Sequence, residues 1–421
     1  MIGEAHSLHG IEDLALAPAP ALSAVASAAG AALLSSYQSR DSLFSSASTQ
    51  LHARGVLQSL THSIDGDLAG ASERLLAYVA AETGRLPMIG AVPFASDEPS
   101  RLWVPSQAVF AAGRARHRGA ALSGLNAEQR PMPRVEPVPA PAQFMRNVER
   151  SLDRIVAGGI SKVVMSRSLR IAARVDLPQL LGQLLARAPG AYTFAMDLAG
   201  AGGPQACLIG SSPELLLSKR GARIVSNPLA GSIPRHPDPH EDQRRARGLL
   251  ESAKDLHEHA LVIGSVAAAL RPYCRELQVP ASPSLIATPT MWHLSTRVDG
   301  VLIDPSTSSL RLALALHPTP AVCGYPTEQA REVIRELEGY ERGLFTGLVG
   351  WCDSEGDGEW AVTIRCAVVE EECATVFAGA GIVAGSQPRD ELAETTAKLG
   401  TMLGAMGLAH AAEAGGVQGS A

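Results

Sequence analysis

Lysine is scarce in this sequence: only four of the 36 lysine and arginine residues are lysine. The four are Lys162, Lys219, Lys254 and Lys398. Arginine keeps its proton in proteins, whereas a buried lysine can release it, so the rare lysines are candidates for proton transfer. Lys162 begins the apolar run 162–171 (KVVMSRSLRI), where a charge is costly unless it has a task. Lys219 stands beside Arg220 and Gly221 at the tip of a predicted hairpin, and we expect it to be solvated.

Other features are also missing, and each absence excludes a class of protein. The formal net charge is −6 and no long basic run occurs, so nucleic acid is not expected as a partner. No uninterrupted apolar stretch reaches the ~20 residues of a membrane-spanning helix. The apolar segment 14–34 lacks the basic start of a signal peptide, because no lysine or arginine precedes Arg40. We therefore expect a cytoplasmic protein with no membrane partner.

Cysteine pairs are absent as well. The six cysteines are scattered over the 421 residues and form no C-x-x-C motif. This pattern indicates free thiols or small buried residues, and neither a disulfide framework nor a zinc cluster is expected. Aromatic residues make up only 4% of the chain, but the hydrophobic content of 46% is ample for a large core.

The apolar pattern predicts strands that are neighbours in sequence, with helices inserted between them in blocks. The expected helices cover residues 145–157, 177–187, 239–272, 306–316 and 326–338, and a last one begins near 388. The expected strands include 162–171, 192–197, 206–209, 359–370 and 374–383, with a hairpin over 213–228. The many prolines between 93 and 145 suggest a linker or an extended surface segment. The order of the elements favours an α+β fold over a doubly wound sheet.

Titratable groups crowd the start of an apolar helix in the sequence ESAKDLHEHALVIG. His257 and His259 are two positions apart, about 200° around a helix, so they cannot bind one zinc ion together. Asp255 and Glu258 are three positions apart and share a face that continues into the core. Ser252 resembles an N-cap, which leaves open that Asp255 only stabilises the helix N-terminus.

A second acidic helix is predicted from the sequence QPRDELAETTAKLGTML. Glu391, Glu394 and Lys398 fall on one face of this helix, away from its leucines. If the two acidic helices face each other, four carboxylates surround one gap. All-oxygen ligands suit Mg²⁺ better than Zn²⁺. Either carboxylate pair alone is also compatible with a solvated helix face.

The glycine-rich sequence AGAGIVAG follows a predicted strand and resembles a dinucleotide-binding motif. The further strand and acidic residue of a Rossmann unit do not follow it, so we reject that interpretation. Gly379 and Gly381 suggest instead that the backbone approaches an anion near a helix start. Arg365 lies in the predicted strand 359–370, where its guanidinium would bind a carboxylate in a bidentate manner. A structural glutamate is the alternative partner for this arginine.

Nine stretches of the chain resemble the chorismate-utilising enzymes, in the order found in that family. They are KVVMSR, SSPELLL, NPLAGSIPR, KDLHEHALV, TPTMWHL, LHPTPAVCGYP, GLVGWCDSEGDGEWAVTIRCA, FAGAGIV and ELAETTAKL. The similarity covers about residues 144–408 and is greatest to the isochorismate synthases of catechol-siderophore pathways. Residues before about 140 match only loosely, around RDSLFSSASTQLHARG.

The resemblance implies an α+β fold in which two large, mainly antiparallel β-sheets pack as a sandwich flanked by helices. It implies one large domain over residues 1–421, with a divergent N-terminal part over 1–143 and a chorismate-binding catalytic core over 144–408. It also implies a monomer that binds chorismate and isochorismate as small-molecule ligands and needs no obligate glutaminase subunit.

The resemblance further implies a Mg²⁺-dependent conversion of chorismate to isochorismate, in which water adds at C2 and the C4 hydroxyl leaves. The product would feed the biosynthesis of 2,3-dihydroxybenzoate and catechol siderophores, or of salicylate. Lys162 matches the general base and Glu214 the general acid, which an apolar site and neighbouring carboxylates are expected to keep protonated. The matches to magnesium ligands are Glu258 and Glu394, with Asp255 and Glu391 as supporting carboxylates. The matches to substrate-binding positions are Ala230, Gly231, His293, Ala321, Arg365, Gly379, Ala380, Gly381 and Lys398.

Related activities are distinguished by single positions. Salicylate synthases share Lys162 and the glutamates, eliminate pyruvate in addition, and are the main alternative. Aminodeoxychorismate synthases carry a covalent lysine where this chain has Ala230, and anthranilate synthases generally lack a lysine at position 162. The chain differs from the siderophore-pathway isochorismate synthases that it resembles at Val322, where those enzymes more often have leucine. Menaquinone-pathway isochorismate synthases share the chemistry, and an inactive chorismate-binding paralogue is the non-enzymatic alternative.

Overall fold

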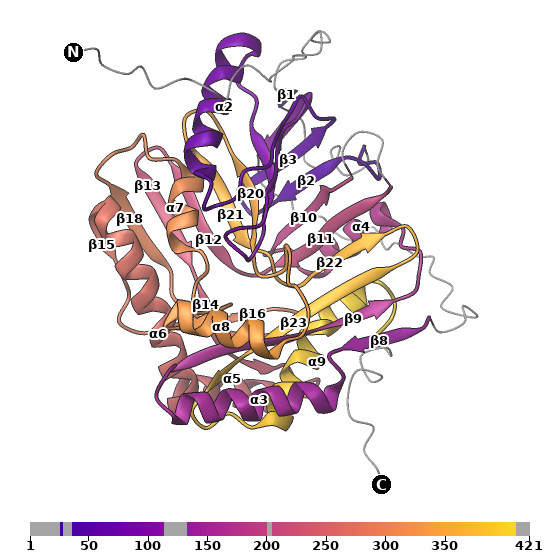
Figure 1. Ribbon diagram of the computed structural model, residues 1–421, viewed down its shortest axis with the longest axis vertical. Coiled ribbons are helices and arrows are strands. Elements are labelled where there is room, and N and C mark those ends of the chain that lie inside the picture. The colour runs from indigo at the N-terminus through magenta and orange to yellow at the C-terminus, as the bar shows by residue number, and fades with distance from the viewer. Residues whose placement is uncertain (1–25, 28–35, 113–132, 200–203, 410–421) are drawn as a thin grey trace, which may run out of the picture.

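The computed structural model describes residues 26–27, 36–112, 133–199 and 204–409. Two large β-sheets form its centre, and helices cover their outer faces (Figure 1). All strand pairs in the described residues are antiparallel except the short pairing at the outer edge of the first sheet. The predicted α+β sandwich with flanking helices is therefore confirmed.

The first sheet has eleven strands among the described residues. In spatial order they are β1 (Ala26–Ser27), β7 (Gln107–Ala112), β3 (Thr49–Arg54), β2 (Ser42–Ser45), β10 (Tyr192–Asp197), β11 (Ala206–Ser212), β22 (Cys366–Glu370), β23 (Ala374–Val383), β9 (Lys162–Ile171) and β19 (Gly324–Tyr325), with β8 (Val135–Val138) also paired to β9. The long strands β9 and β23 pair along their whole length, from Lys162 opposite Val383 to Ile171 opposite Ala374.

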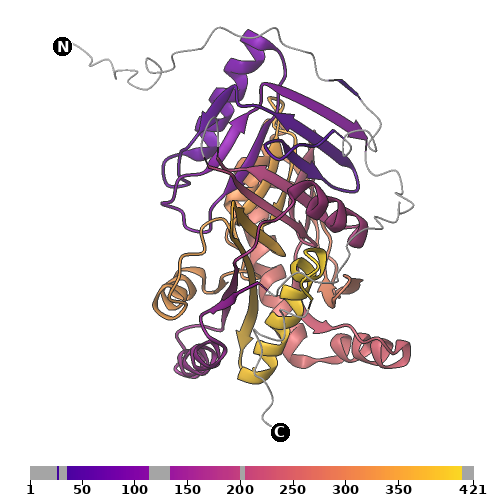
Figure 2. The ribbon, with the colours of Figure 1, turned by 90° about the vertical axis from the view of Figure 1, so that its right-hand side faces the viewer.

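The second sheet has nine described strands, and a small third sheet lies beside it. The second sheet runs in the order β15 (Cys274–Gln278), β18 (Val298–Leu302), β13 (Arg223–Asn227), β12 (Leu215–Arg220), β21 (Gly358–Val362), β20 (Leu348–Cys352), β5 (Met88–Val92), β6 (Arg101–Val104) and β4 (Gln58–Leu60). The third contains β14 (Leu229–Pro234), β17 (Met291–Ser295) and β16 (Ser284–Ala287). Strands from residues 36–112 therefore join both large sheets, as the indigo segments in Figure 2 show.

The helices are α2 (Leu68–Thr83), α3 (Pro141–Val156), α4 (Leu177–Arg187), α5 (Pro239–Glu251), α6 (Ala253–Leu270), α7 (Ser309–Leu316), α8 (Thr327–Leu337) and α9 (Pro388–Ala405), with a short 3₁₀ turn at Arg271–Tyr273. Helix α5 projects from the body of the molecule (Figure 2). No helix in the described part of the chain is long and apolar enough to cross a membrane.

Successive strand residues point to opposite faces of a sheet, and the core is divided accordingly. Phe194 and Leu208 of the first sheet pack between the two large sheets with Trp360 of the second. Their neighbours Ala195 and Ile209 face the other way, toward α4 and α9. A third cluster joins α3 and α8 to β9. Both faces of the first sheet are thus covered by apolar side chains.

Three predictions about local structure differ from the observed fold. The predicted strand 359–370 is two strands, because the chain leaves the second sheet after Val362 and enters the first at Cys366. The predicted helix 239–272 is broken at Ser252, which caps α6. The described parts of 93–145 are not a linker, since they hold β6, β7 and β8. The alternative of an extended surface segment fits β8, which has no buried residue; residues 113–132 lie outside the described residues.

The expectation that Lys219 is solvated is wrong. Its side chain is 1% exposed, and its Nζ lies 2.8 Å from Asp357 Oδ1 in a neighbouring turn. The same carboxylate oxygen accepts a hydrogen bond from the Gly221 amide at 2.8 Å. The hairpin tip is therefore covered by the turn over residues 353–357, a contact that neither segment reveals in its own sequence.

Candidate active site

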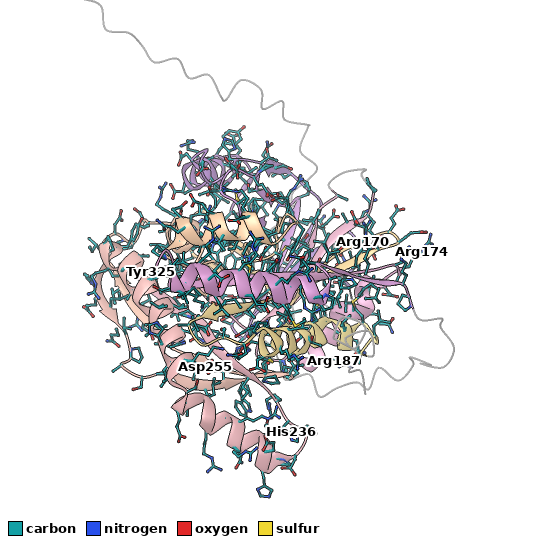
Figure 3. All side chains as sticks on the ribbon, turned by 60° about the horizontal axis from the view of Figure 1, so that its bottom comes forward. Arg170, Arg174, Arg187, His236, Asp255 and Tyr325 are labelled. Carbon is teal, nitrogen blue, oxygen red and sulfur yellow. The ribbon has the colours of Figure 1, made fainter. Side chains whose placement is uncertain are left out.

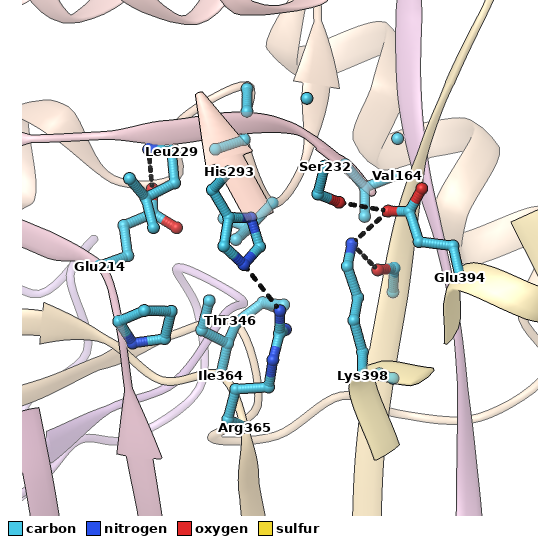
Figure 4. A pocket seen from close by; sticks show the side chains of 18 of the residues that line it. Val164, Glu214, Leu229, Ser232, His293, Thr346, Ile364, Arg365, Glu394 and Lys398 are labelled. Carbon is cyan, nitrogen blue, oxygen red and sulfur yellow. Dashed lines mark hydrogen bonds and ion pairs between the residues drawn. The ribbon is translucent and has the colours of Figure 1, made fainter. Parts of the chain in front are cut away.

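One pocket gathers most of the predicted site residues, although they come from distant parts of the chain (Figure 4). Eleven of them line it: Glu214, Ala230, Gly231, Glu258, His293, Ala321, Arg365, Gly379, Gly381, Glu394 and Lys398. Four do not line it: Lys162, Asp255, Ala380 and Glu391. Ala380 is 1% exposed within β23, between the two glycines that do line the pocket.

Lys162 does not line the pocket, but it forms an ion pair with Glu258, which does. The lysine is fully buried at the start of β9, and its Nζ lies 2.9 Å from Glu258 Oε1. This ion pair is its only polar contact in the described residues. Gly381 faces the pair from β23, and a Cβ there would lie 2.2 Å from Glu258 Oε1 and 3.0 Å from Lys162 Cε. Glycine at this position is therefore needed for space.

The two predicted carboxylate pairs do belong to helices that begin near the pocket. Ser252 caps α6 by accepting a hydrogen bond from the Asp255 amide, so the predicted N-cap is confirmed. Figure 3 shows Asp255 near the base of α5, where α6 begins. Burial is the largest effect on the Asp255 carboxyl and raises its pKa, and the nearby Glu258 raises it further.

Glu394 of α9 is held by two donors on different elements. Its Oε1 accepts a hydrogen bond from Ser232 Oγ at 3.0 Å and lies 2.5 Å from Lys398 Nζ. Lys398 also donates to the Gly379 carbonyl oxygen at 2.8 Å. Burial acts to raise the pKa of Glu394, but Lys398, Ser232 and Lys254 together outweigh it and leave the pKa lowered. Glu394 is therefore an ionised carboxylate that faces the pocket.

Glu391 lies one turn earlier on α9 and is paired with a lysine from the other acidic helix. Lys254 Nζ lies 2.9 Å from Glu391 Oε1, and Glu391 Oε2 is buried without a hydrogen-bond partner in the described structure. Burial and the negative charge of Glu394 raise the pKa of Glu391. The pair links the first turns of α6 and α9.

These carboxylates fit a hard divalent cation. No three His, Cys, Asp or Glu side chains of the described residues converge into a ready-made metal cage. Mg²⁺ does not need one, because it is commonly bound by one or two carboxylates and completes its octahedron with water and substrate oxygens. Glu258 and Glu394 both face the pocket, and the Glu258 carboxylate occupies the space that a side chain at Gly381 would take.

Glu214 is a buried carboxyl on the opposite side of the pocket from Glu394 (Figure 4). Burial raises its pKa to about 7, although the Leu229 amide and the more distant charge of Lys162 act against this. Neighbouring carboxylates do not contribute to the shift, contrary to our expectation, and burial alone is sufficient. Glu214 can therefore hold a proton near neutral pH.

Arg365 is not within a strand, as the sequence suggested, but in the break between β21 and β22. Its φ is +50°, a conformation that is strained for a residue with a side chain. The guanidinium Nη2 lies 3.4 Å from His293 Nε2, and no carboxylate of the described residues forms an ion pair with it. Because arginine only donates, the His293 nitrogen is the acceptor. The structural glutamate considered as an alternative partner is therefore not found.

His293 and Arg365 share an environment that opposes positive charge. Burial lowers the pKa of His293 well below its usual value, and the nearby Arg365 and Lys398 lower it further. Burial also lowers the pKa of Arg365, to about 10. A neutral histidine beside two cations gives this side of the pocket a positive potential that suits an anionic ligand.

The two glycines expected near a helix start lie instead within β23, opposite β9. Gly379 pairs with Ser166 and Gly381 with Val164, several residues before α9 begins. Their backbone still faces the pocket. The expected position near a helix start is therefore wrong, and the approach of this backbone to an anion stays a prediction.

Sequence reasoning assigned no role to the other residues that line the pocket. They are Val164, Pro213, Leu229, Ser232, Phe345, Thr346, Ile364, Phe377 and Ala378; Val322, noted above as a departure from related sequences, also lines the pocket. Phe345 and Phe377 stack with their ring centroids 5.0 Å apart and form an apolar wall. Several of these residues lie within the nine sequence motifs, so the motifs could have marked them as candidates. Only the fold shows which of their side chains face the pocket.

Comparison with known proteins agrees with this arrangement. The family described as "Chorismate binding enzyme" matches residues 113–407. The chain is 51% identical to isochorismate synthase DhbC of Bacillus subtilis, over 77% of this chain and 81% of that protein. It is 43% identical to the vibriobactin-specific isochorismate synthase of Vibrio cholerae, over 87% of this chain and 91% of that protein.

A solved structure described as "putative 2,3-dihydroxybenzoate-specific isochorismate synthase, DhbC from Bacillus anthracis" has the same fold. Its TM-score is 0.84 at 44% identity, and the match covers 90% of this chain and 99% of that chain. The chain belongs to the chorismate-binding enzyme family. The resemblance inferred from the nine sequence motifs is therefore confirmed.

We expect Glu214 to be protonated below and ionised above about pH 7, since burial raises its pKa to that value. Infrared difference spectra between the protein and its Glu214→Gln variant test this at about pH 5.5 and about pH 8.5, roughly 1.5 units below and above that pKa. A protonated carboxyl band should be present at the lower pH and absent at the higher pH. Absence of the band at the lower pH would contradict the assignment.

Proposed function

We propose that the protein is an isochorismate synthase, which converts chorismate to isochorismate. The observation that carries the proposal is the buried Lys162, whose only polar partner among the described residues faces the same pocket as the proton-holding Glu214. A base and an acid beside one pocket are what an exchange of hydroxyl groups requires. The identity of 43–51% to isochorismate synthases, over most of each chain, supports the same activity.

In the proposed reaction, Lys162 acts in its neutral form and removes a proton from a water molecule as the water oxygen bonds to C2 of chorismate. The ring double bonds shift, the C4–O bond breaks, and Glu214 donates its proton to the departing hydroxyl. One water enters and one water leaves, so the net reaction is an isomerisation. Burial suits Glu214 to the role of general acid, because a carboxyl with a pKa of about 7 still holds its proton in about half of the molecules at neutral pH.

Arg365 and Lys398 would bind the carboxylates of the substrate. Arg365 has no carboxylate partner among the described residues and offers a guanidinium that can hold one in a bidentate manner. His293 and the backbone of Gly379 and Gly381 complete that side, while Ala230, Gly231 and Ala321 leave room for the ring. The stack of Phe345 and Phe377 gives the uncharged part of the substrate an apolar surface.

We propose that Glu258 and Glu394 would hold Mg²⁺, with Asp255 and Glu391 as supporting carboxylates. When bound, the ion would supply positive charge that neutralises a substrate carboxylate and fixes its position. Glu394 is kept ionised by Lys398, as a ligand must be. Glu391 is oriented by Lys254 and retains one unpartnered oxygen.

Salicylate synthase is the second candidate activity. Elimination of pyruvate would require the intermediate to be retained and re-oriented in the same pocket. Ala321 and Val322 line the pocket and offer no side-chain hydrogen bond for this purpose. We therefore favour release of isochorismate with its enolpyruvyl group intact.

We further propose that the protein is a cytoplasmic monomer without a glutaminase subunit and that it acts in a siderophore pathway. In this proposal residues 1–421 form one domain, and residues 144–408 form its catalytic core.

The product distinguishes the two activities. With chorismate and Mg²⁺, we expect a mixture of chorismate and isochorismate, since two isomers of similar energy approach equilibrium from either side. Starting from isochorismate, chorismate should form again. Chromatography of the products and a lactate dehydrogenase assay for pyruvate measure this outcome. Stoichiometric pyruvate and salicylate, above the rate without enzyme, would assign the protein to the salicylate synthases.

The role of Lys162 predicts that a permanent cation cannot replace it. Lys162→Ala should lower kcat by at least about 100-fold. Lys162→Arg keeps the charge opposite Glu258 but cannot give up its proton, so we expect a similar loss. Circular dichroism should show that both variants are folded. Lys219→Arg, which changes a buried lysine outside the pocket, is the matched control and should stay active. Near-normal turnover by Lys162→Arg would contradict the assignment of Lys162 as the general base.

The metal site predicts a shared dependence on two glutamates. Glu258→Gln and Glu394→Gln should each weaken Mg²⁺ binding by at least tenfold, roughly the cost of losing one of two charged ligands, and isothermal titration without substrate measures this directly. Asp255→Asn should have a smaller effect, because Asp255 does not line the pocket. EDTA should abolish turnover of the wild-type protein and added Mg²⁺ should restore it. Full activity in EDTA would refute the site.

A further inference from the structure

His259 is a buried polar residue that the proposed mechanism does not use. It follows Glu258 on α6 and is 3% exposed. Its Nδ1 lies 3.0 Å from the Ala230 carbonyl oxygen, and its Nε2 lies 2.7 Å from Thr296 Oγ1. A carbonyl oxygen only accepts, so Nδ1 must carry the proton, and Nε2 of the neutral ring accepts from the Thr296 hydroxyl. Both ring nitrogens are therefore occupied.

The carbonyl that His259 binds belongs to a β-bulge in the wall of the pocket. Strand β14 gains one residue relative to β17, so that Ala230 and Gly231 together face Leu294. An extra residue disrupts the hydrogen-bond ladder of a sheet and redirects the backbone. Gly231 has a φ of +77°, which only glycine adopts without strain. The bulge thus needs a donor from outside the sheet, and His259 supplies one.

The same bulge is in direct contact with the first turn of α6. A Cβ on Gly231 would lie 3.1 Å from Asp255 Cβ and 3.2 Å from the Asp255 carbonyl oxygen. Thr296, the second partner of His259, comes immediately after β17, the strand that carries His293. A single imidazole therefore connects the helix that carries Glu258 to both strands that form this wall of the pocket.

We propose that His259 is a positioning residue, which fixes the Ala230–Gly231 bulge against α6 so that the substrate wall and Glu258 keep their relative positions. The assignment rests on the proposed isochorismate synthase activity. Misplacement of reacting groups by about 1 Å can cost about 100-fold in rate. A shift of the bulge would produce such a misplacement, because Ala230 and Gly231 line the pocket together with Glu258.

Three substitutions of His259 separate its two hydrogen bonds. His259→Leu removes both and leaves the buried Ala230 carbonyl without a donor, and we expect kcat/KM for chorismate to fall about 100-fold. His259→Asn places an amide nitrogen near the position of Nδ1, and we expect it to retain kcat/KM within about tenfold of the wild type. His259→Gln reaches toward Thr296 instead of Ala230 and should be as impaired as the leucine variant.

His257→Asn is the matched control, because His257 is exposed on the same helix two residues earlier; its kcat/KM should equal that of the wild type. Thermal unfolding followed by circular dichroism accompanies each assay. A merely structural role predicts that kcat/KM falls only in step with thermal stability, whereas a positioning role predicts a loss of kcat/KM in variants that remain fully folded at the assay temperature. If His259→Leu does not fold, the comparison of His259→Asn with His259→Gln still decides.

The proposal is overturned if folded His259→Leu turns over at the wild-type rate, or if the asparagine and glutamine variants are equally impaired. Failure of the proposed function would be visible separately, since the wild-type protein itself would then leave chorismate unchanged. Selective rescue by His259→Asn, with unchanged activity of His257→Asn, supports the positioning role.

Discussion

The ion pair between Lys162 and Glu258 is the interaction on which the arrangement of the pocket depends. A charge removed from water costs several kcal/mol unless an opposite charge compensates it, and the Lys162 side chain is completely buried. Strand β9 and helix α6 must therefore meet at this point. The pair also excludes any side chain from position 381 of β23, where a Cβ would collide with the carboxylate. Three elements far apart in sequence are thus fixed around one contact.

The same rule explains why the scarce lysines are where they are. Each of the four forms an ion pair with a carboxylate from a different turn or element: with Glu258, Asp357, Glu391 and Glu394. A lysine presents a compact charge at the end of a flexible stem, which suits a single oxygen in a narrow space. Two of the four pairs, Lys162–Glu258 and Lys398–Glu394, include residues that line the pocket, and Lys254–Glu391 joins the starts of the two helices that carry Glu258 and Glu394. Arg365 lines the same pocket and forms no ion pair with a carboxylate of the described residues, so its guanidinium is available to an anionic ligand.

Sequence reasoning predicted the architecture and most of the pocket, and its errors have a common cause. Helix 177–187, strands β9 and β23 and the cap at Ser252 follow local patterns, and they were predicted with few errors. The break at Arg365 could not be seen, because residues 359–370 are apolar on both sides of it and each half is buried in a different sheet. Lys219 was misjudged since Asp357 approaches it only after the second sheet has formed. Chemistry specified by short motifs was therefore accessible from sequence, whereas contacts made by tertiary packing were not.

Glu214 and Glu258 show how the fold gives similar side chains different properties. Both are buried and both face the pocket. Glu258 has Lys162 at ion-pair distance. Glu214 has only a weak contact of 3.4 Å from the Leu229 amide, and the nearest cations act on it from farther away. Desolvation therefore dominates at Glu214 and favours its neutral form. The position of Lys162 on β9 therefore determines that Glu258 has an ion-pair partner and that Glu214 has none at that distance.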